Sequence, residues 1–453
     1  MVALCGCSGP DYGPRLLDDL RAEGLIHDRG AEVTPSLELE IPADPIDLQG
    51  SGELSLEMLF AIAEERHPRL AAARASIGAA GGRAWQATLP PNPSVEIESE
   101  NVRPSNGGLG VSDTTVSLSQ PIVTGQRRQA AAAAGQADIA RQRLAVEEIR
   151  REIHARIRRV AAEITFDRAA IAHYERLIEV ASETLRIAEA RLEAGAAPET
   201  EAIRARVEVN SITLALQRLR GSLAVAAEEL KTSLGGVALD IDRLPVSTLQ
   251  RDPARSLRPL DEIDAAVRGA HPAILAARWA IESARRQVDV EKSLSRPDWT
   301  ARFGVGVSHA DDEGFVEGGL SAPLTIFDRN QGRILAARFE VIRWSREAEA
   351  IENDIAGSLA QAYRRWESAR AGLIAFEAQI LSGAQQAYDQ TVIGYEAGRL
   401  PLLDVLDAQR TLIEATLSQL ELGRAVSLAL SEVDQITGGP IESSTQPQTG
   451  EVP

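Results

Sequence analysis

The sequence predicts a mainly α-helical protein with a small β part, built from two copies of one half. Residues 193–198 read Glu-Ala-Gly-Ala-Ala-Pro, and residues 396–401, which lie 203 positions later, read Glu-Ala-Gly-Arg-Leu-Pro. Long stretches lack proline and have heptad spacing, and aromatic residues make up only 4% of the chain. Long helices that pack through small aliphatic side chains are typical of this composition, and a repeat of this length indicates a duplicated half-protein.

The composition also limits what the chain can bind. The net charge is −18, which argues against a nucleic-acid-binding surface. The two cysteines are Cys5 and Cys7. Residues 4–8, Leu-Cys-Gly-Cys-Ser, resemble a lipoprotein cleavage box, so residues 1–7 are interpreted as a truncated signal with Cys7 as the acylation site. The alternatives are a Cys-x-Cys metal pair or two incidental thiols.

The first half begins with residues 8–50, which we expect to form an extended arm. Residues 51–236 form the first predicted repeat: a helix over 55–86 that Pro68 interrupts, strands over 94–102 and 114–120, a long helix over 126–193, a turn at Gly195, and a helix over 199–234. The strands follow from period-2 alternation and the helices from period-3.6 spacing. The long helix has a heptad seam, as in coiled coils: Ile153, Ile157, Val160, Ile164, Ile171, Tyr174, Ile178, Ala181, Leu185, Ala188 and Leu192.

The second half repeats this plan after an irregular linker over residues 237–259. The second repeat, residues 260–438, is predicted to contain a helix over 260–295, strands over 299–307 and 315–324, a long helix over 332–396, and a final helix that ends at Thr437. The seam of its long helix contains Ile355, Leu359, Ala362, Trp366, Ala369, Leu373, Phe376 and Ile380. Residues 439–453 are polar and predicted to be disordered.

The four predicted strands have the length that crosses an outer membrane at a tilt. Four strands cannot close a barrel, and an open edge is not stable in lipid, so membrane strands would have to share a barrel with other chains. The alternative is a pair of soluble hairpins that cap a helical rod. Trp299 and Phe303 lie on the apolar face of one strand, which favours the membrane interpretation.

Three segments show a resemblance to a known family. Residues 119–122 read Ser-Gln-Pro-Ile, residues 395–408 read Tyr-Glu-Ala-Gly-Arg-Leu-Pro-Leu-Leu-Asp-Val-Leu-Asp-Ala, and residues 7–12 read Cys-Ser-Gly-Pro-Asp-Tyr. With the duplication, they resemble the TolC family of outer-membrane efflux ducts over about residues 52–439. The resemblance implies a homotrimer in the Gram-negative outer membrane, lipid-anchored at Cys7. A shared 12-stranded transmembrane β-barrel would stand over a periplasmic α-barrel tunnel of long coiled-coil helices.

The resemblance also implies partners and a site. The tips would contact a periplasmic adaptor, which connects the duct to an inner-membrane pump, through Gly195, Ala196, Gly398, Arg399 and Leu400. The tunnel's periplasmic gate would include Tyr395, Asp404, Asp407, Thr200 and Glu201. Rings of carboxylates in a narrow pore favour cations. The family often has aspartate at the position of Glu201, and some members have arginine at that of Leu400, so ion pairing in the closed gate is in question.

Simpler explanations exist for two of these residues. Asp404 could be an acid that complements the dipole of its helix, and Tyr395 could be an ordinary packing residue. His67 and His271 each precede a proline at equivalent repeat positions, which favours a role at a helix kink over metal binding. The sequence contains no ligand spacing, phosphate-binding loop or nucleophile motif, so we expect no cofactor and no enzyme activity.

The function expected is therefore the outer-membrane channel of a tripartite efflux system, which passively conducts solutes. An RND-type pump that exports metal cations or drugs is the expected driver. Residues 90–101 and the Ser-Gln-Pro-Ile box at 119–122 resemble the heavy-metal branch. One alternative is the duct of a type I protein secretion system. The other is a soluble coiled-coil scaffold, which would need no membrane.

Overall fold

The computed structural model describes residues 18–19, 21–22, 26–29, 32–35, 53–100, 113–124, 126–244, 256–309, 313–397 and 399–439. Cys7 and Gly398 lie outside the described residues, as do most of the predicted arm, residues 245–255 of the linker and nearly all of the tail. The chain forms two compact units. Unit 1 contains residues 1–39, 72–146 and 272–351, and unit 2 contains residues 40–71, 147–271 and 352–453.

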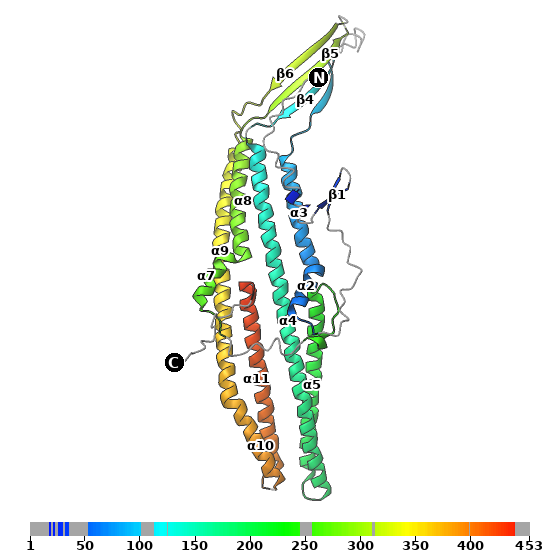
Figure 1. Ribbon diagram of the computed structural model, residues 1–453, viewed down its shortest axis with the longest axis vertical. Helices are drawn as coiled ribbons and strands as arrows, with labels where there is room; N and C mark the ends of the chain where they lie inside the picture. Colours follow the sequence, from blue (N-terminus) through cyan, green and yellow to red (C-terminus); the bar gives the residue numbers. More distant parts are fainter. Residues whose placement is uncertain are drawn as a thin grey trace, which may run out of the picture. The chain divides into compact units, whose positions relative to one another are not determined.

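Unit 1 contains an antiparallel sheet whose strands are β3 (Ser94–Glu100), β4 (Asp113–Ile122), β5 (Trp299–Ser308) and β6 (Glu313–Ser321), in that order (Figure 1). The predicted strands are confirmed, one hairpin from each repeat. The last strand ends at Ser321, so Pro323 follows it. A proline cannot donate a ladder hydrogen bond, which explains why the predicted strand over 315–324 was too long. Separately, β1 (Ile26–Arg29) pairs with β2 (Glu32–Pro35) within the predicted arm.

The register of this sheet separates charge from apolar surface. Val95 is opposite Leu118, Leu118 is opposite Phe303, and Val305 is opposite Val316. Val95, Ile97 and Val316 are 68%, 75% and 68% exposed. The face that they share carries no charged residue. Every charged residue of the four strands lies on the other face: Glu96, Glu98, Glu100, Asp113, Arg302, Glu313 and Glu317.

Arg302 connects the strands on the charged face. Its guanidinium is 2.7 Å from the Glu98 carboxylate and 3.4 Å from that of Glu317, and Nε donates to Ser117 Oγ at 3.0 Å. Gly306 allows the Phe315 ring to lie over the backbone, because a Cβ there would be 2.4 Å from the ring. The charged face is therefore held together by side chains from all four strands.

The helices of unit 1 connect directly to this sheet. They are α3 (Pro68–Thr88), the start of α4 (Arg127–Glu193), α8 (Pro272–Leu294) and the start of α9 (Gln331–Phe376). Gly135 of α4 packs against Ala84 of α3 so closely that a Cβ would be 2.4 Å from the Ala84 Cβ. Asp298, just before β5, accepts from Thr124 N at 3.1 Å and pairs with Arg127 at 2.9 Å. These contacts tie the strand ends of both repeats to α4.

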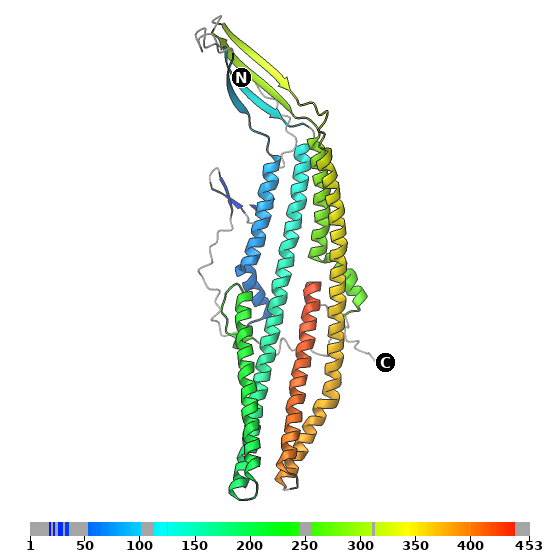
Figure 2. The ribbon, with the colours of Figure 1, turned by 180° about the vertical axis from the view of Figure 1, so that it is seen from behind.

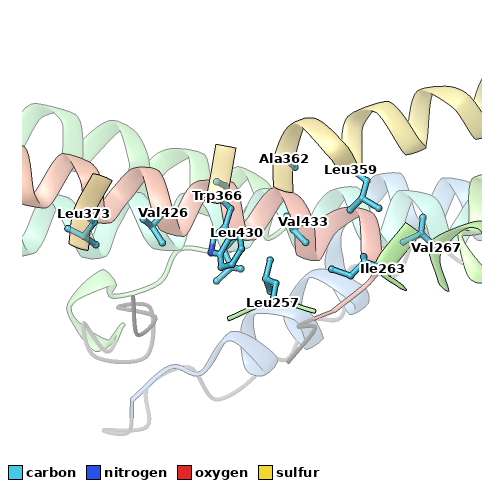
Figure 3. Packing of buried hydrophobic residues seen from close by; sticks show 11 residues of the cluster. Leu257, Ile263, Val267, Leu359, Ala362, Trp366, Leu373, Val426, Leu430 and Val433 are labelled. Atoms are coloured by element: carbon cyan, nitrogen blue, oxygen red, sulfur yellow. The ribbon is translucent and has the colours of Figure 1, made fainter. Parts of the chain in front are cut away.

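Unit 2 is helical in its described part. It contains α2 (Leu56–Arg66), α5 (Glu199–Ser233), the 3₁₀ turn η3 (Ile241–Arg243), α7 (Leu260–Ala270), the π-helical segment η4 (Glu377–Leu381), α10 (Ser382–Glu396) and α11 (Leu402–Thr437), with the remaining parts of α4 and α9. Figure 2 shows α5 following α4 and α11 following α10 as two helical hairpins. One core joins α7, α9 and α11, with Trp366 packed among side chains such as Leu430 and Val433 (Figure 3).

The two histidine–proline pairs lie at helix junctions, as expected. His67 ends α2 and donates its backbone N–H to Ala63 O, and α3 begins at Pro68. His271 ends α7 with a bond to Val267 O, and α8 begins at Pro272. Each of the predicted helices 55–86 and 260–295 is therefore two helices. In the first pair, the imidazole Nδ1 also accepts from Arg69 N at 3.2 Å, which caps α3.

The heptad seams are confirmed except at one residue. Ile157, Ile164 and Leu359 are fully buried, as the pattern predicted. Ile380, predicted to continue the second seam, is 51% exposed, so that prediction was wrong. The physical reason is η4, in which a π turn adds one residue and rotates the side chains that follow. The buried position after this segment is Ala384, eight residues after Phe376 instead of seven.

His271 gives the fold a specific pH dependence. Burial and the nearby Arg151 guanidinium lower the pKa of His271 from 6.5 to about 4. The unfolded chain therefore binds this proton first as the pH falls. The stabilising contribution is fully present above pH 6.5 and is lost as the pH falls toward 4. The carboxylate of Glu148 is 3.8 Å from the imidazole, and burial raises its pKa. The contribution of Glu148 to the free energy of unfolding therefore changes with pH in the opposite direction to that of His271.

We expect the melting temperature of the wild-type protein to fall more steeply between pH 7 and pH 4.5 than that of His271→Gln. Both proteins keep Glu148, so the difference between the two curves isolates the imidazole. Thermal unfolding followed by circular dichroism at several pH values measures it. Parallel curves would show that His271 does not control the pH dependence.

Candidate functional site

The first helical tip is built by its backbone. Helix α4 ends at Glu193, Gly195 has a φ of 68°, and two hydrogen bonds run from Gly195 N to Leu192 O and from Ala196 N to Arg191 O at 2.9 and 2.8 Å. This pair of bonds is a Schellman motif, which requires the left-handed conformation that glycine adopts without strain. Gly195 and Ala196 are exposed at the end of the hairpin, where the sequence predicted an adaptor contact.

The second tip repeats this geometry at the position predicted by the repeat. Arg399 N donates to Gly394 O at 2.9 Å, the equivalent of the bond from Ala196. The Leu400 side chain packs against Gly394 in the last turn of α10. The contact is so close that a Cβ on Gly394 would be 2.5 Å from the Leu400 side chain. Arg399 is exposed and Leu400 is half-buried. The second tip therefore presents a cation, whereas the first presents alanine.

The acids that follow each tip occupy equivalent places. Helix α5 begins after Pro198 and α11 after Pro401, and neither proline can supply a side-chain cap. Glu201 and Asp404 are each in the first helical turn, where a negative charge complements the helix dipole. Their placement agrees with the simpler explanation of Asp404. Thr200 is exposed beside Glu201.

Tyr395 is buried where the two hairpins meet. It is 5% exposed and packs with Ala188 of α4, Ala205 of α5 and Val405 of α11. The Arg191 guanidinium lies over the ring, 4.9 Å from its centroid. The phenol oxygen is buried, and no described residue bonds to it. Within one chain Tyr395 is thus a packing residue that joins the two tips, and its predicted gating role stays a prediction.

Two grooves lie on the helices next to the tips. The Tyr395 groove, of about 370 Å³, lies between α4 and the pair α10 and α11 and is lined by Glu179, Val180, Glu183, Thr184, Ile187, Tyr388, Val392, Tyr395 and Val405. The Asp407 groove, of about 290 Å³, lies between α5 and α11 and is lined by Ile203, Arg204, Val207, Glu208, Leu403, Leu406, Asp407 and Arg410. Of the predicted gate residues, Tyr395 lines the first groove and Asp407 the second. Asp404, Thr200 and Glu201 line neither.

Three arginines near the tips were not predicted from the sequence. Arg191 covers Tyr395, whereas Arg204 and Arg410 line the groove of Asp407. The repeat contained a signal for one of them, since Arg204 lies 203 positions before Asp407, the offset that relates the two tips. The charge near the predicted gate residues is therefore mixed in the Asp407 groove, whereas the sequence interpretation expected rings of acids.

The described residues contain no helix long and apolar enough to cross a membrane. Among these same residues, no group of three or more histidine, cysteine, aspartate or glutamate side chains could hold a metal ion.

A duplicated pair of helical hairpins joined to a sheet with one apolar and one charged face defines a class of protein, the helical outer-membrane channels. The outer membrane efflux protein family matches residues 59–236 and 266–439. The chain belongs to this family, and its place is the outer membrane. The match divides at the linker, one part for each repeat.

Individual relatives agree with this assignment. The chain is 27% identical over 390 residues to the cobalt-zinc-cadmium resistance protein CzcC of Cupriavidus metallidurans, covering 86% of this chain and 91% of that protein. It is 27% identical over 278 residues to the nickel-cobalt-cadmium resistance protein NccC of Alcaligenes xylosoxydans xylosoxydans, with 60% of each covered. The outer membrane protein VceC of Vibrio cholerae has the same fold, with a TM-score of 0.67 and 20% identity over 85% of this chain and 97% of that one.

Proposed function

We propose that the chain is the outer-membrane duct of a tripartite efflux system that exports divalent metal cations. Three chains would form the duct and share one barrel. A periplasmic adaptor would bind the tips of each chain, and an inner-membrane pump of the RND type would supply the cargo. The protein would act as a passive conduit and not as an enzyme, with no cofactor.

The observation that carries this proposal is the separation of charge on the four-stranded sheet. One face is uncharged and exposes side chains such as Ile97 and Phe303, as the outside of a membrane barrel does. The other face carries seven charged residues, suited to a water-filled lumen. In the described chain β3 pairs only with β4 and β6 only with β5, so both edges are open. Three copies joined edge to edge make a closed 12-stranded barrel, which removes these edges.

The metal cargo is supported by charge and by two relatives. Six of the seven charged strand residues are acidic, so a lumen lined by this face attracts cations. The names of CzcC and NccC describe resistance to cobalt, zinc, nickel and cadmium. We also propose that Cys7 carries the lipid anchor, on the basis of the sequence around it. Incorporation of labelled palmitate into the wild-type protein but not into Cys7→Ser would test this addition, and equal labelling of the two proteins would contradict it.

Deletion of the gene in the native host tests the function directly. We expect the deletion strain to tolerate less cobalt, zinc and cadmium and to accumulate more of these metals, measured by growth and by mass spectrometry of washed cells. The wild-type gene on a plasmid should restore both. If metal tolerance and content are unchanged while a secreted protein disappears from the medium, the duct serves protein secretion and the metal proposal is wrong.

A further inference from the structure

The repeat places opposite charges at one level of the two tips. Glu201 and Asp404 are equivalent and both acidic, but one helical turn further on Arg204 is the equivalent of Asp407. Residues three or four apart share a helix face. Arg204 therefore lies one turn after Glu201 on α5, and Asp407 lies one turn after Asp404 on α11. Arg204 and Asp407 line the same groove, from opposite helices. The duplication has thus produced an acid at one copy of the position and a base at the other.

Arg204 is free for such a role, whereas its neighbour is not. Arg206, two residues away, pairs with Glu189 of α4 at 2.7 Å and so joins the two helices of its own hairpin. Arg204 is exposed and makes no ion pair with any described residue, and the same holds for Asp407. Ile203, Val207 and Leu403, which border these charges, are also exposed in the single chain. This groove therefore combines uncommitted charges with uncovered apolar surface.

We propose that Arg204 is the counter-charge of Asp407 at the periplasmic entrance and sets both its closure and its cation preference. This inference rests on the trimeric duct proposed above. Threefold symmetry turns each position into a ring. The level of Glu201 and Asp404 is then wholly acidic, whereas the next level alternates between Arg204 and Asp407.

This arrangement has two physical consequences. When the tips approach the threefold axis, the opposite charges of Arg204 and Asp407 attract each other and stabilise the closed entrance. A ring of acids alone would instead destabilise the closed entrance by like-charge repulsion. The positive charges also reduce the cation preference that the first ring creates. Arg204 is therefore a residue that determines selectivity, acting through the electrostatics of the entrance.

Purified protein in planar bilayers tests the proposal with Arg204→Ala, and Arg206→Ala is the matched control on the same helix. We expect Arg204→Ala to raise the conductance of the resting channel about tenfold, because three partly exposed ion pairs are lost together. Its reversal potential in a KCl gradient should shift toward stronger cation preference. Arg206→Ala should change neither quantity, apart from an effect on stability.

A charge exchange keeps the test decisive if the alanine variant assembles poorly. Arg204→Asp combined with Asp407→Arg should return the resting conductance close to the wild-type value, whereas each single change should raise it. The proposal is overturned if Arg204→Ala has the same effect in an Asp407→Ala background as in the wild type, because the two side chains are then uncoupled. A wild-type protein that forms no channel at all would instead contradict the proposed duct.

Discussion

Replacing Asp404 and Asp407 together by alanine will raise the resting conductance of the channel about tenfold, since three weak ion-pair contacts are lost in the trimer. The double variant will also lose part of its cation preference. Asp407 lines a groove with Arg204 and Arg410, so its removal leaves these two cations with Glu208 as the one acid among the lining residues of that groove. A closed entrance that brings them near the axis is then destabilised by like-charge repulsion.

The single variants separate two roles that the sequence left open. Asp404 is in the first turn of α11, where it complements the helix dipole, so Asp404→Ala should mainly lower the stability of the tip, by about 0.5 kcal/mol. Asp407→Ala should account for most of the change in conductance, because its side chain faces the groove.

Asp389→Ala is a suitable control for the gate variants. Asp389 is an exposed acid of α10 that accepts a hydrogen bond from Gln385 of the same helix at 3.0 Å, and it lies outside both grooves. Its removal should leave conductance and reversal potential at the wild-type values. If the double variant behaves like Asp389→Ala in bilayers, Asp404 and Asp407 have no part in the gate.

Substituting Gly235 by alanine will have the largest effect on folding. Gly235 follows α5 with a φ of 77°, and a Cβ there would be 2.6 Å from the backbone oxygen of Arg66 and 2.8 Å from its carbonyl carbon. Backbone atoms at a helix junction cannot move aside as a flexible side chain can. We expect a loss of about 2–4 kcal/mol, from the strain of a positive φ and from overpacking.

Its neighbour provides a matched control. Gly236 also has a positive φ, of 93°, but a Cβ there would have no atom within 4 Å. Gly236→Ala should therefore cost only the backbone strain, about 1 kcal/mol. Thermal unfolding of both variants in detergent measures the difference. Equal losses would show that the contact with Arg66 is unimportant and that only the backbone conformation matters.

Local pattern was enough to predict the long helices and the strands of the four-stranded sheet, but not the β1–β2 hairpin within the predicted arm. The period-2 alternation of residues 299–307 identified β5, which spans Trp299–Ser308, and the proline-free heptads identified α4, which begins at Arg127 and ends at Glu193. Ile380 shows where this reasoning stops. The π-helical segment Glu377–Leu381 shifts the seam by one residue, and a heptad pattern that looks regular in the sequence does not reveal it.

The candidate site was predicted less completely than the fold. The repeat located both tips and the acids that follow them, because glycine and proline determine the turns locally. It could not show that Tyr395 is buried under Arg191 or that Arg204 shares a groove with Asp407. These relations join residues that are distant in sequence and depend on which faces of four helices meet.

Single-channel recording tests the central claim most directly, on purified protein whose subunit number is determined in the same preparation by native mass spectrometry. The duct interpretation predicts that three chains assemble and that this trimer inserts into planar bilayers in uniform conductance steps that prefer cations. A protein that stays monomeric in aqueous buffer, needs no detergent and produces no conductance would contradict it, and would favour a soluble coiled-coil scaffold.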